Sequence, residues 1–113
     1  MSPGAFDAAA KALPAAAMDV QWGGENVYKV GGRMFAVLGS HGGCSFKVSD
    51  IAFEAMIEAG IGRPAPYLAR AKWVRLDDLS AQDPAEVADW LRTAHALVAA
   101  KLTRAKRREL GLD

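Results

Sequence analysis

The chain has 113 residues, of which 51% are hydrophobic, and its formal net charge is +1. A chain of this size suits one domain that buries roughly two-thirds of its unfolded surface. No run approaches the ~20 apolar residues of a membrane-spanning helix, and the first residues lack the basic and apolar regions of a signal peptide. The single cysteine, Cys44, excludes an internal disulfide. We therefore expect one domain over residues 1–113, in the cytoplasm and without membrane contact.

The first expected element is a helix that begins at Ser2 and Pro3. Serine caps the free amide groups of a helix, and proline suits the first helical position. Helical spacing then aligns an apolar stripe made of Phe6, Ala9, Ala10 and Leu13. Pro14 ends or kinks this helix. Its many alanines favour close packing against an apolar surface.

Residues 19–48 contain short runs rich in β-branched and aromatic residues, separated by glycines. The runs are 19–22, 26–30, 33–38 and 44–48. Paired glycines between such runs are typical of tight hairpins between antiparallel strands. In the third run Met34, Ala36 and Leu38 fall on one side, which is wholly apolar. This segment therefore predicts a four-stranded meander with one side on a core.

A second helix and a fifth strand are expected next. The helix begins at Ser49 or Asp50 and ends at Gly60, which suits a left-handed C-terminal turn. Residues 60–67 contain two prolines and predict an ordered, non-helical crossing. Residues 72–76 alternate and predict a fifth strand beside the meander, at an edge of the sheet.

The last third of the chain contains the clearest helix pattern. Asp83 suits the cap, Pro84 the first helical position, and Glu86 can return to the backbone of the cap. The apolar stripe that follows is Val87, Leu91, Ala94, Val98 and Leu102. Thr103 can cap a short last helix closed by Gly111. The expected fold class is α+β, an antiparallel meander sheet of four to five strands with helices packed on one face.

No pattern in the sequence points to catalysis or to a metal. His41 and Cys44 are separated by only two residues, but a zinc site needs three or four ligands and His95 lies far away in sequence. The glycines lack the strand-to-helix setting of phosphate loops. An enzyme is therefore poorly supported, and we expect no metal site. An enzyme would require His41, Cys44 and His95 to converge in one pocket.

Basic residues gather around the fifth strand and in the last helix. The candidates for contacts with phosphates are Arg70, Lys72, Arg75, Arg104, Lys106, Arg107 and Arg108. Trp73 lies among the first group, and an aromatic ring between cations can stack on bases. Two simpler interpretations stay open: the charged helix only keeps the protein in solution, and Trp73 points inward to cover the first helix. Tyr67 is ambiguous in the same way.

Several motifs together resemble the MmcQ/YjbR family. In chain order they are Leu13-Pro14, Gln21-Trp22-Gly23, the run from Lys29 to Leu38, the run from Pro64 to Leu68, Lys72-Trp73-Val74, Leu97-Val98 and Lys101-Leu102. The similarity covers nearly the whole chain. The family often has a serine–tyrosine pair where this chain has Ala94 and His95, so a role for those hydroxyls is not carried over. We expect His95 at the edge of the core.

The resemblance implies an α+β fold similar to CyaY, the bacterial frataxin, and no cofactor or catalytic residue. Members of the family are commonly described as DNA-binding proteins with a double-wing arrangement. The iron-binding acidic ridge of frataxins is not carried over, because Asp7 stands almost alone in the first helix.

Two functions follow as expectations. The first is a non-enzymatic DNA-binding domain that uses the seven basic candidates together with Trp73. It is favoured if the two basic groups share one surface. The alternative is a module that binds a protein or a small ligand through an exposed sheet face. The residues expected on that face are Tyr28, Phe35, Val37 and Trp73.

Overall fold

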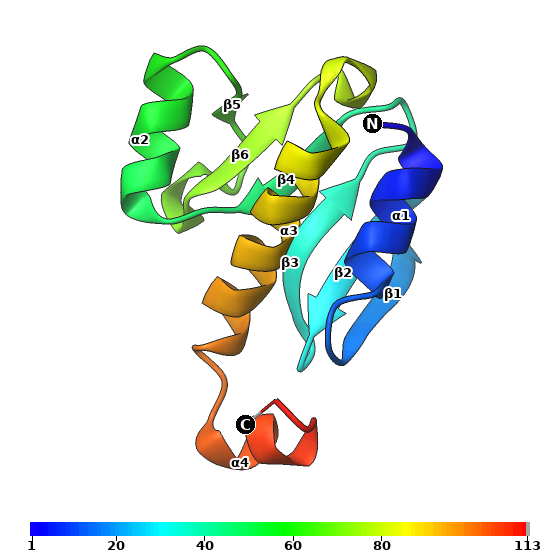
Figure 1. Ribbon diagram of the computed structural model, residues 1–113, viewed down its shortest axis with the longest axis vertical. Coiled ribbons are helices and arrows are strands. Elements are labelled where there is room, and N and C mark those ends of the chain that lie inside the picture. Colours follow the sequence, from blue (N-terminus) through cyan, green and yellow to red (C-terminus); the bar gives the residue numbers. More distant parts are fainter. Residues whose placement is uncertain (113) are drawn as a thin grey trace.

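The computed structural model describes residues 1–112 and contains one antiparallel sheet packed against helices (Figure 1). The strands are β1 (Ala16–Gln21), β2 (Glu25–Val30), β3 (Arg33–Leu38), β4 (Cys44–Lys47), β5 (Arg63–Pro64) and β6 (Trp73–Leu76). Six strands lie in the order β1-β2-β3-β4-β6-β5, and each neighbouring pair is antiparallel. The predicted α+β class is confirmed, with one strand more than the largest number expected.

The glycine-separated meander forms as predicted, although its first strand is longer. Gly31 and Gly32 both have positive φ angles, as a tight two-residue hairpin between β2 and β3 requires. β1 begins at Ala16 rather than at Asp19, because Ala16 and Ala17 pair with the end of β2. Alanine is depleted in strands, so the start of β1 had no clear pattern in the sequence.

The predicted fifth strand needs two corrections. It corresponds to β6, which lies between β4 and β5 instead of at an edge. The edge strand is the two-residue β5, in which Arg63 pairs with Arg75 and Pro64 with Val74. Lys72 is not part of β6, because its φ of 61° is left-handed.

The helices begin at the residues that the caps predicted. They are α1 (Pro3–Lys11), α2 (Asp50–Glu58), α3 (Pro84–Ala99) and α4 (Arg104–Glu109), with short 3-10 turns η1 (Ala69–Ala71) and η2 (Leu79–Ala81). The cap residues Ser2, Ser49, Asp83 and Thr103 each accept a hydrogen bond from an amide of the first turn. Gly60 follows the end of α2 with a φ of +71°, as predicted.

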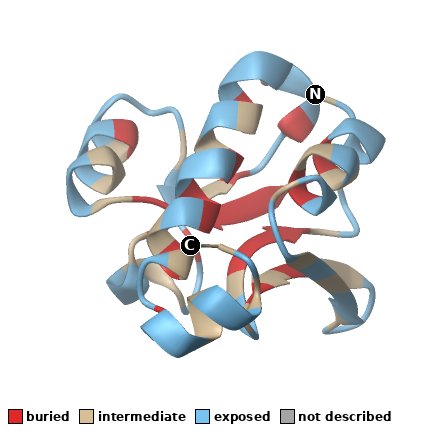
Figure 2. Cartoon of the chain, turned by 60° about the horizontal axis from the view of Figure 1, so that its bottom comes forward, coloured by how far each residue is buried: buried red, intermediate tan, exposed pale blue. Residues whose placement is uncertain are grey.

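The main core lies between one face of the sheet and the helices α1 and α3, which pack side by side (Figure 1). Phe6 of α1 and Leu91 of α3 contact this core, and Phe46 of β4 stacks on the ring of Trp90. A register shift in the pairing of β2 with β3 leaves Phe35 and its neighbour Ala36 both in this core. The expectation that Met34 shares the core side with Ala36 and Leu38 is therefore wrong, because Met34 packs against the cluster on the opposite face. Figure 2 shows the buried positions in the central strands and on the helix sides that face them.

We call the opposite face of the sheet the helix-free face. Segment 65–72 crosses part of it, and the Ala65 amide donates to the Trp73 carbonyl at 3.0 Å. Beneath this segment Val27, Val37, Ala65 and Trp73 form a second, smaller cluster. The interpretation in which Trp73 covers the first helix is therefore wrong, although its indole is indeed buried.

Candidate functional site

A basic hollow of about 290 Å³ lies at the end of the sheet where β3 begins and β4 ends. The cations Arg33, Lys47 and Lys101 line it, and Met34 and Trp73 supply part of its apolar wall. Arg33 begins β3, Lys47 ends β4 and Lys101 follows α3, so three elements distant in sequence bring these charges together.

Lys47 is at the centre of this positive charge. Its ammonium group donates to the carbonyl oxygen of Ala71. Burial lowers the pKa of Lys47, and the nearby charges of Lys101 and Lys72 lower it further, against an opposing effect of Asp50. The net effect favours loss of the Lys47 proton. A bound anion would reverse this effect, because it would favour the charged ammonium form.

The cations of the hollow form no ion pair with a carboxylate among residues 1–112. Within residues 1–112, no ion pair includes Arg33, Lys47, Lys72 or Lys101. Lys72 instead places its ammonium group 5.0 Å from the centre of the Phe53 ring. The hollow therefore has an excess of positive charge.

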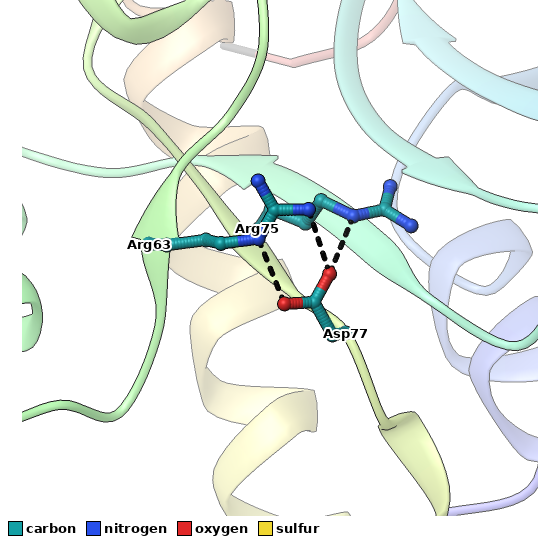
Figure 3. Close-up of polar contacts among 3 residues, drawn as sticks. All are labelled: Arg63, Arg75 and Asp77. Carbon is teal, nitrogen blue, oxygen red and sulfur yellow. Dashed lines mark hydrogen bonds and ion pairs between the residues drawn. The ribbon is translucent and has the colours of Figure 1, made fainter.

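Arg75, one of the predicted phosphate contacts, lies in a different environment. The carboxylate of Asp77 accepts hydrogen bonds from both Arg63 and Arg75 (Figure 3). The distances are 2.7 and 2.9 Å from Arg63 and 2.9 Å from the Nε of Arg75. The hydrogen bonds from Arg63 and Arg75 lower the pKa of Asp77 to about 2. At neutral pH the carboxylate therefore offsets part of the positive charge of Arg75.

Two of the predicted cations of α4 also make polar contacts within the protein. Lys106 lies 3.7 Å from Glu109. Arg107 donates to the carbonyl oxygens of Ala100 and Leu102 at 3.3 and 2.8 Å, which ties α4 to the end of α3. The remaining predicted cations Arg104 and Arg108 of α4 and Arg70 of η1 are exposed. None of the seven predicted cations lines the hollow. They lie instead in segment 70–72, in the Asp77 network and in α4.

The prediction that Trp73 stacks on bases needs correction. Only 4% of Trp73 is exposed, because it packs on Val27 and Val37 beneath Ala65. Trp73 forms part of the wall of the basic hollow. The expected interaction patch is wrong for a related reason: Tyr28 and Phe35 lie in the main core and are fully buried.

A second depression, which we call the aromatic groove, lies on the helix-free face and has a volume of about 480 Å³. Met34 and Val37 of β3 contribute to it, as does Leu68. Trp22 and Tyr67 line it from two different loops and are exposed, Trp22 to 61% and Tyr67 completely. Tyr67, ambiguous in the sequence, is therefore a surface residue.

Most of the residues that line the hollow and the groove were not predicted as site residues from the sequence. Strand alternation places Lys47 on the face opposite to Phe46, and Trp22 directly precedes a glycine pair, so both were detectable as surface residues. The convergence of Lys47 with Arg33 and Lys101 was not detectable, since it depends on how α3 crosses the sheet.

His41, Cys44 and His95 do not form a common site. Burial raises the pKa of the Cys44 thiol to about 12, which opposes nucleophilic chemistry. His95 is buried, with its Nε2 2.7 Å from the carbonyl oxygen of Pro14 and its ring edge-on to Phe35. It thus lies in the core. His41 is exposed in the loop between β3 and β4.

Residues 1–112 contain neither a metal-binding cluster nor a membrane-spanning helix. This part of the chain has no group of three or more His, Cys, Asp or Glu side chains placed to hold a metal ion. None of its helices combines the length and the apolar character needed to cross a lipid bilayer.

Comparisons with known proteins give a family and a structural relative. The YjbR family model matches residues 11–97. The chain is also similar to the crystal structure of the Deinococcus radiodurans protein DR2400, a DUF419 domain, with 25% sequence identity and a TM-score of 0.83. That similarity covers 96% of this chain and 86% of the other. None of the curated proteins matches the chain significantly.

Proposed function

Because the chain belongs to the YjbR family, we propose that it is a DNA-binding domain that holds phosphates in its basic hollow. The observation behind this proposal is the convergence of Arg33, Lys47 and Lys101 on one hollow without a carboxylate partner among residues 1–112. It is a binding function without a catalytic step.

The physical argument concerns the charge of the hollow. Each cation there repels the others, and Lys47 is also partly desolvated. A phosphate placed among the three cations replaces this repulsion with attraction and releases the counterions of the DNA. Lys101 lies three residues before Arg104, so the exposed cations of α4 can continue the contact along the backbone.

The test is a titration of fluorescently labelled DNA with the protein at several salt concentrations. Binding through about six phosphate contacts should weaken by orders of magnitude from about 50 to about 200 mM salt. Lys101→Glu and Arg33→Glu should each weaken binding roughly tenfold at ~0.1 M salt and reduce the salt slope by about one. Both residues are exposed, so the fold should persist.

Arg92→Glu is the matched control. It makes the same charge change at an exposed position of α3, where Arg92 pairs with Asp89. Arg92 lies nine positions before Lys101, and the helix from Arg92 to the end of α3 at Ala99 alone spans roughly 10 Å at ~1.5 Å per residue. Equal losses for Arg92→Glu and Lys101→Glu would mean that only net charge matters. Absence of any binding to duplex or single-stranded DNA at low salt would refute the proposal.

The alternative function is a module for a protein or a small ligand. The aromatic groove supports it, because a depression of about 480 Å³ is within the size range of ligand sites. Binding that does not change with salt and is lost in a Leu68 variant, while Lys101→Glu has no effect, would favour this alternative.

A further inference from the structure

We propose that the preferred ligand is single-stranded DNA, with an unpaired base in the aromatic groove and a neighbouring phosphate in the basic hollow. This inference rests on the proposed DNA binding and adds the form of DNA that the site selects. Its basis is that the hollow and the groove adjoin and offer the two kinds of contact that a single strand needs.

Met34 joins the two depressions. Its side chain lines both the basic hollow and the aromatic groove. From there the groove follows β3 to Val37 and Gly39. Five residue steps from Met34 to Gly39 correspond to roughly 16 Å at ~3.3 Å per residue. A strand whose phosphate lies among Arg33, Lys47 and Lys101 can therefore direct an adjacent base into the groove.

The groove has the chemistry of a base-binding surface. The indole of Trp22 and the phenol of Tyr67 are flat and exposed, and Val37 and Leu68 add apolar contacts. Stacking on aromatic rings combined with a positive path for the backbone is the usual mode of single-strand binding. Bases in a duplex are already stacked and paired, so they cannot enter the groove.

Polar groups are also present in the groove. Glu25 can accept a hydrogen bond from the amino group of a base, and the hydroxyl of Ser45 and the guanidinium of Arg75 can donate. A small number of polar groups among apolar ones is typical of sites for small ring systems. Charged Arg75 is held in position by Asp77, so it is already oriented before a ligand arrives.

The backbone at the two aromatic residues supports a functional role. Trp22 has a φ of +49° and Tyr67 a φ of +65°, a left-handed region that bulky residues rarely adopt. Glycine would relieve this strain, and Gly23 directly follows Trp22 with a φ of +77°. Exposed rings gain little stability from packing, so strained exposed aromatics favour a role in binding.

Other occupants of the groove are less well matched to these features. A second copy of the chain or an apolar peptide would cover Trp22 and Tyr67 but would bring no negative charge to the cations of the adjoining hollow. One single-stranded DNA molecule can place a base in the aromatic groove and a phosphate in the basic hollow. We therefore choose this occupant, and the experiment distinguishes it from the others.

The experiment compares three labelled ligands of one length: a single strand, the duplex of the same sequence and a single strand with abasic sites. The full chain is tested as wild type, Trp22→Ala, Tyr67→Ala and the control Ile51→Ala. Ile51 is an exposed apolar residue on α2 and lines neither depression. Thermal unfolding of each variant checks that the fold is intact.

We expect the wild type to bind the single strand more tightly than either the duplex or the abasic strand. Trp22→Ala should weaken single-strand binding roughly five- to 100-fold, which corresponds to the loss of one base stack. Tyr67→Ala should weaken it as well, and Ile51→Ala should have no effect. The fluorescence of exposed Trp22 should be quenched by the single strand and not by the abasic one.

The failures of the two proposals can be told apart. Binding of duplex and single strand with equal affinity, unchanged by Trp22→Ala, would overturn this inference and leave the phosphate contacts intact. Absence of binding to all three ligands would overturn both proposals. A self-association that sedimentation detects in the wild type and that Trp22→Ala abolishes would assign the groove to a second copy and also overturn this inference.

Discussion

The two faces of the sheet are covered in different ways. On one face α1 and α3 supply continuous apolar stripes, and side chains such as Phe6, Phe46 and Leu91 have essentially no exposure. On the helix-free face only the irregular segment 65–72 covers the strands, and it buries the small cluster around Trp73. The comparison shows that an incomplete cover leaves a groove, and that groove adjoins the basic hollow.

The largest expected effect tests the helix-covered face. Phe46→Ala removes a fully buried ring that stacks on Trp90 at 5.6 Å between centroids. The free energy of unfolding should fall by about 3–5 kcal/mol, as urea denaturation would measure. The comparison on the other face is Leu68→Ala, which truncates a half-buried side chain and should lower it by about 1–2 kcal/mol. Equal losses of unfolding free energy in the two variants would show that the two faces of the sheet contribute equally to stability.

The next effect concerns the contact between the β2–β3 hairpin and the end of α3. A Cβ at Gly31 would lie 2.7 Å from Cδ1 of Leu102, and Gly31 has a φ of +59°. Gly31→Ala should therefore lower the free energy of unfolding by about 1–3 kcal/mol. It should also weaken DNA binding, since Lys101 precedes Leu102.

Gly32→Ala is the control for this substitution. Gly32 has a φ of +80°, but a Cβ there meets no atom within 4 Å. Gly32→Ala should lower the free energy of unfolding by about 1–2 kcal/mol through backbone strain alone. It should leave DNA binding unchanged. A loss for Gly31→Ala no larger than that for Gly32→Ala would contradict the importance of the Leu102 contact.

A smaller effect of opposite sign is expected on the helix-free face. Trp22→Gly relieves a left-handed backbone at φ +49° while it removes an exposed side chain. The free energy of unfolding should rise by up to about 1 kcal/mol, because relief of strain outweighs the greater freedom of glycine in the unfolded chain. Single-strand binding should weaken at the same time. A substitution that destabilises the protein would show that Trp22 is a packing residue.

The smallest expected effect is the pH dependence of the Asp77 network. The pKa of Asp77 is lowered to about 2 in the folded state, from about 3.9 in an unfolded chain. Its contribution to stability is therefore present above about pH 4 and is lost as the pH falls toward 2. The difference in Tm between wild type and Asp77→Asn should be positive near pH 6 and should shrink in this window.

Salt provides the control for the Asp77 prediction. The network is exposed, so the same difference in Tm should also decrease with added salt. A difference in Tm that stays constant from pH 6 to pH 2 would contradict the assigned pKa of Asp77.

Local patterns predicted most of the elements. Asp83 and Pro84 marked the start of α3, and the glycine pairs marked the hairpins, because caps and tight turns depend on residues close together in sequence. β5 was missed because two residues that include a proline do not form a recognisable strand pattern. Lys72 was assigned to a strand because its left-handed backbone leaves no trace in the residue type.

The functional surface was harder to predict than the elements. In β6, Val74 and Leu76 lie in the main core and Trp73 lies in the cluster on the opposite face, in keeping with the alternation that predicted a strand. That alternation did not show that segment 65–72 covers Trp73. The predicted stacking residue was therefore buried, and the exposed indole of Trp22 was left unassigned.

The amino-acid sequence by itself determined the α+β class, the antiparallel hairpins and the starts of the helices. Each of these follows from the conformational preferences of a few neighbouring residues. Only the tertiary structure decided which sheet face stays open and that Arg33, Lys47 and Lys101 meet in one hollow. The reason is that such a meeting depends on where separate elements cross, and a crossing is set by packing over the whole core.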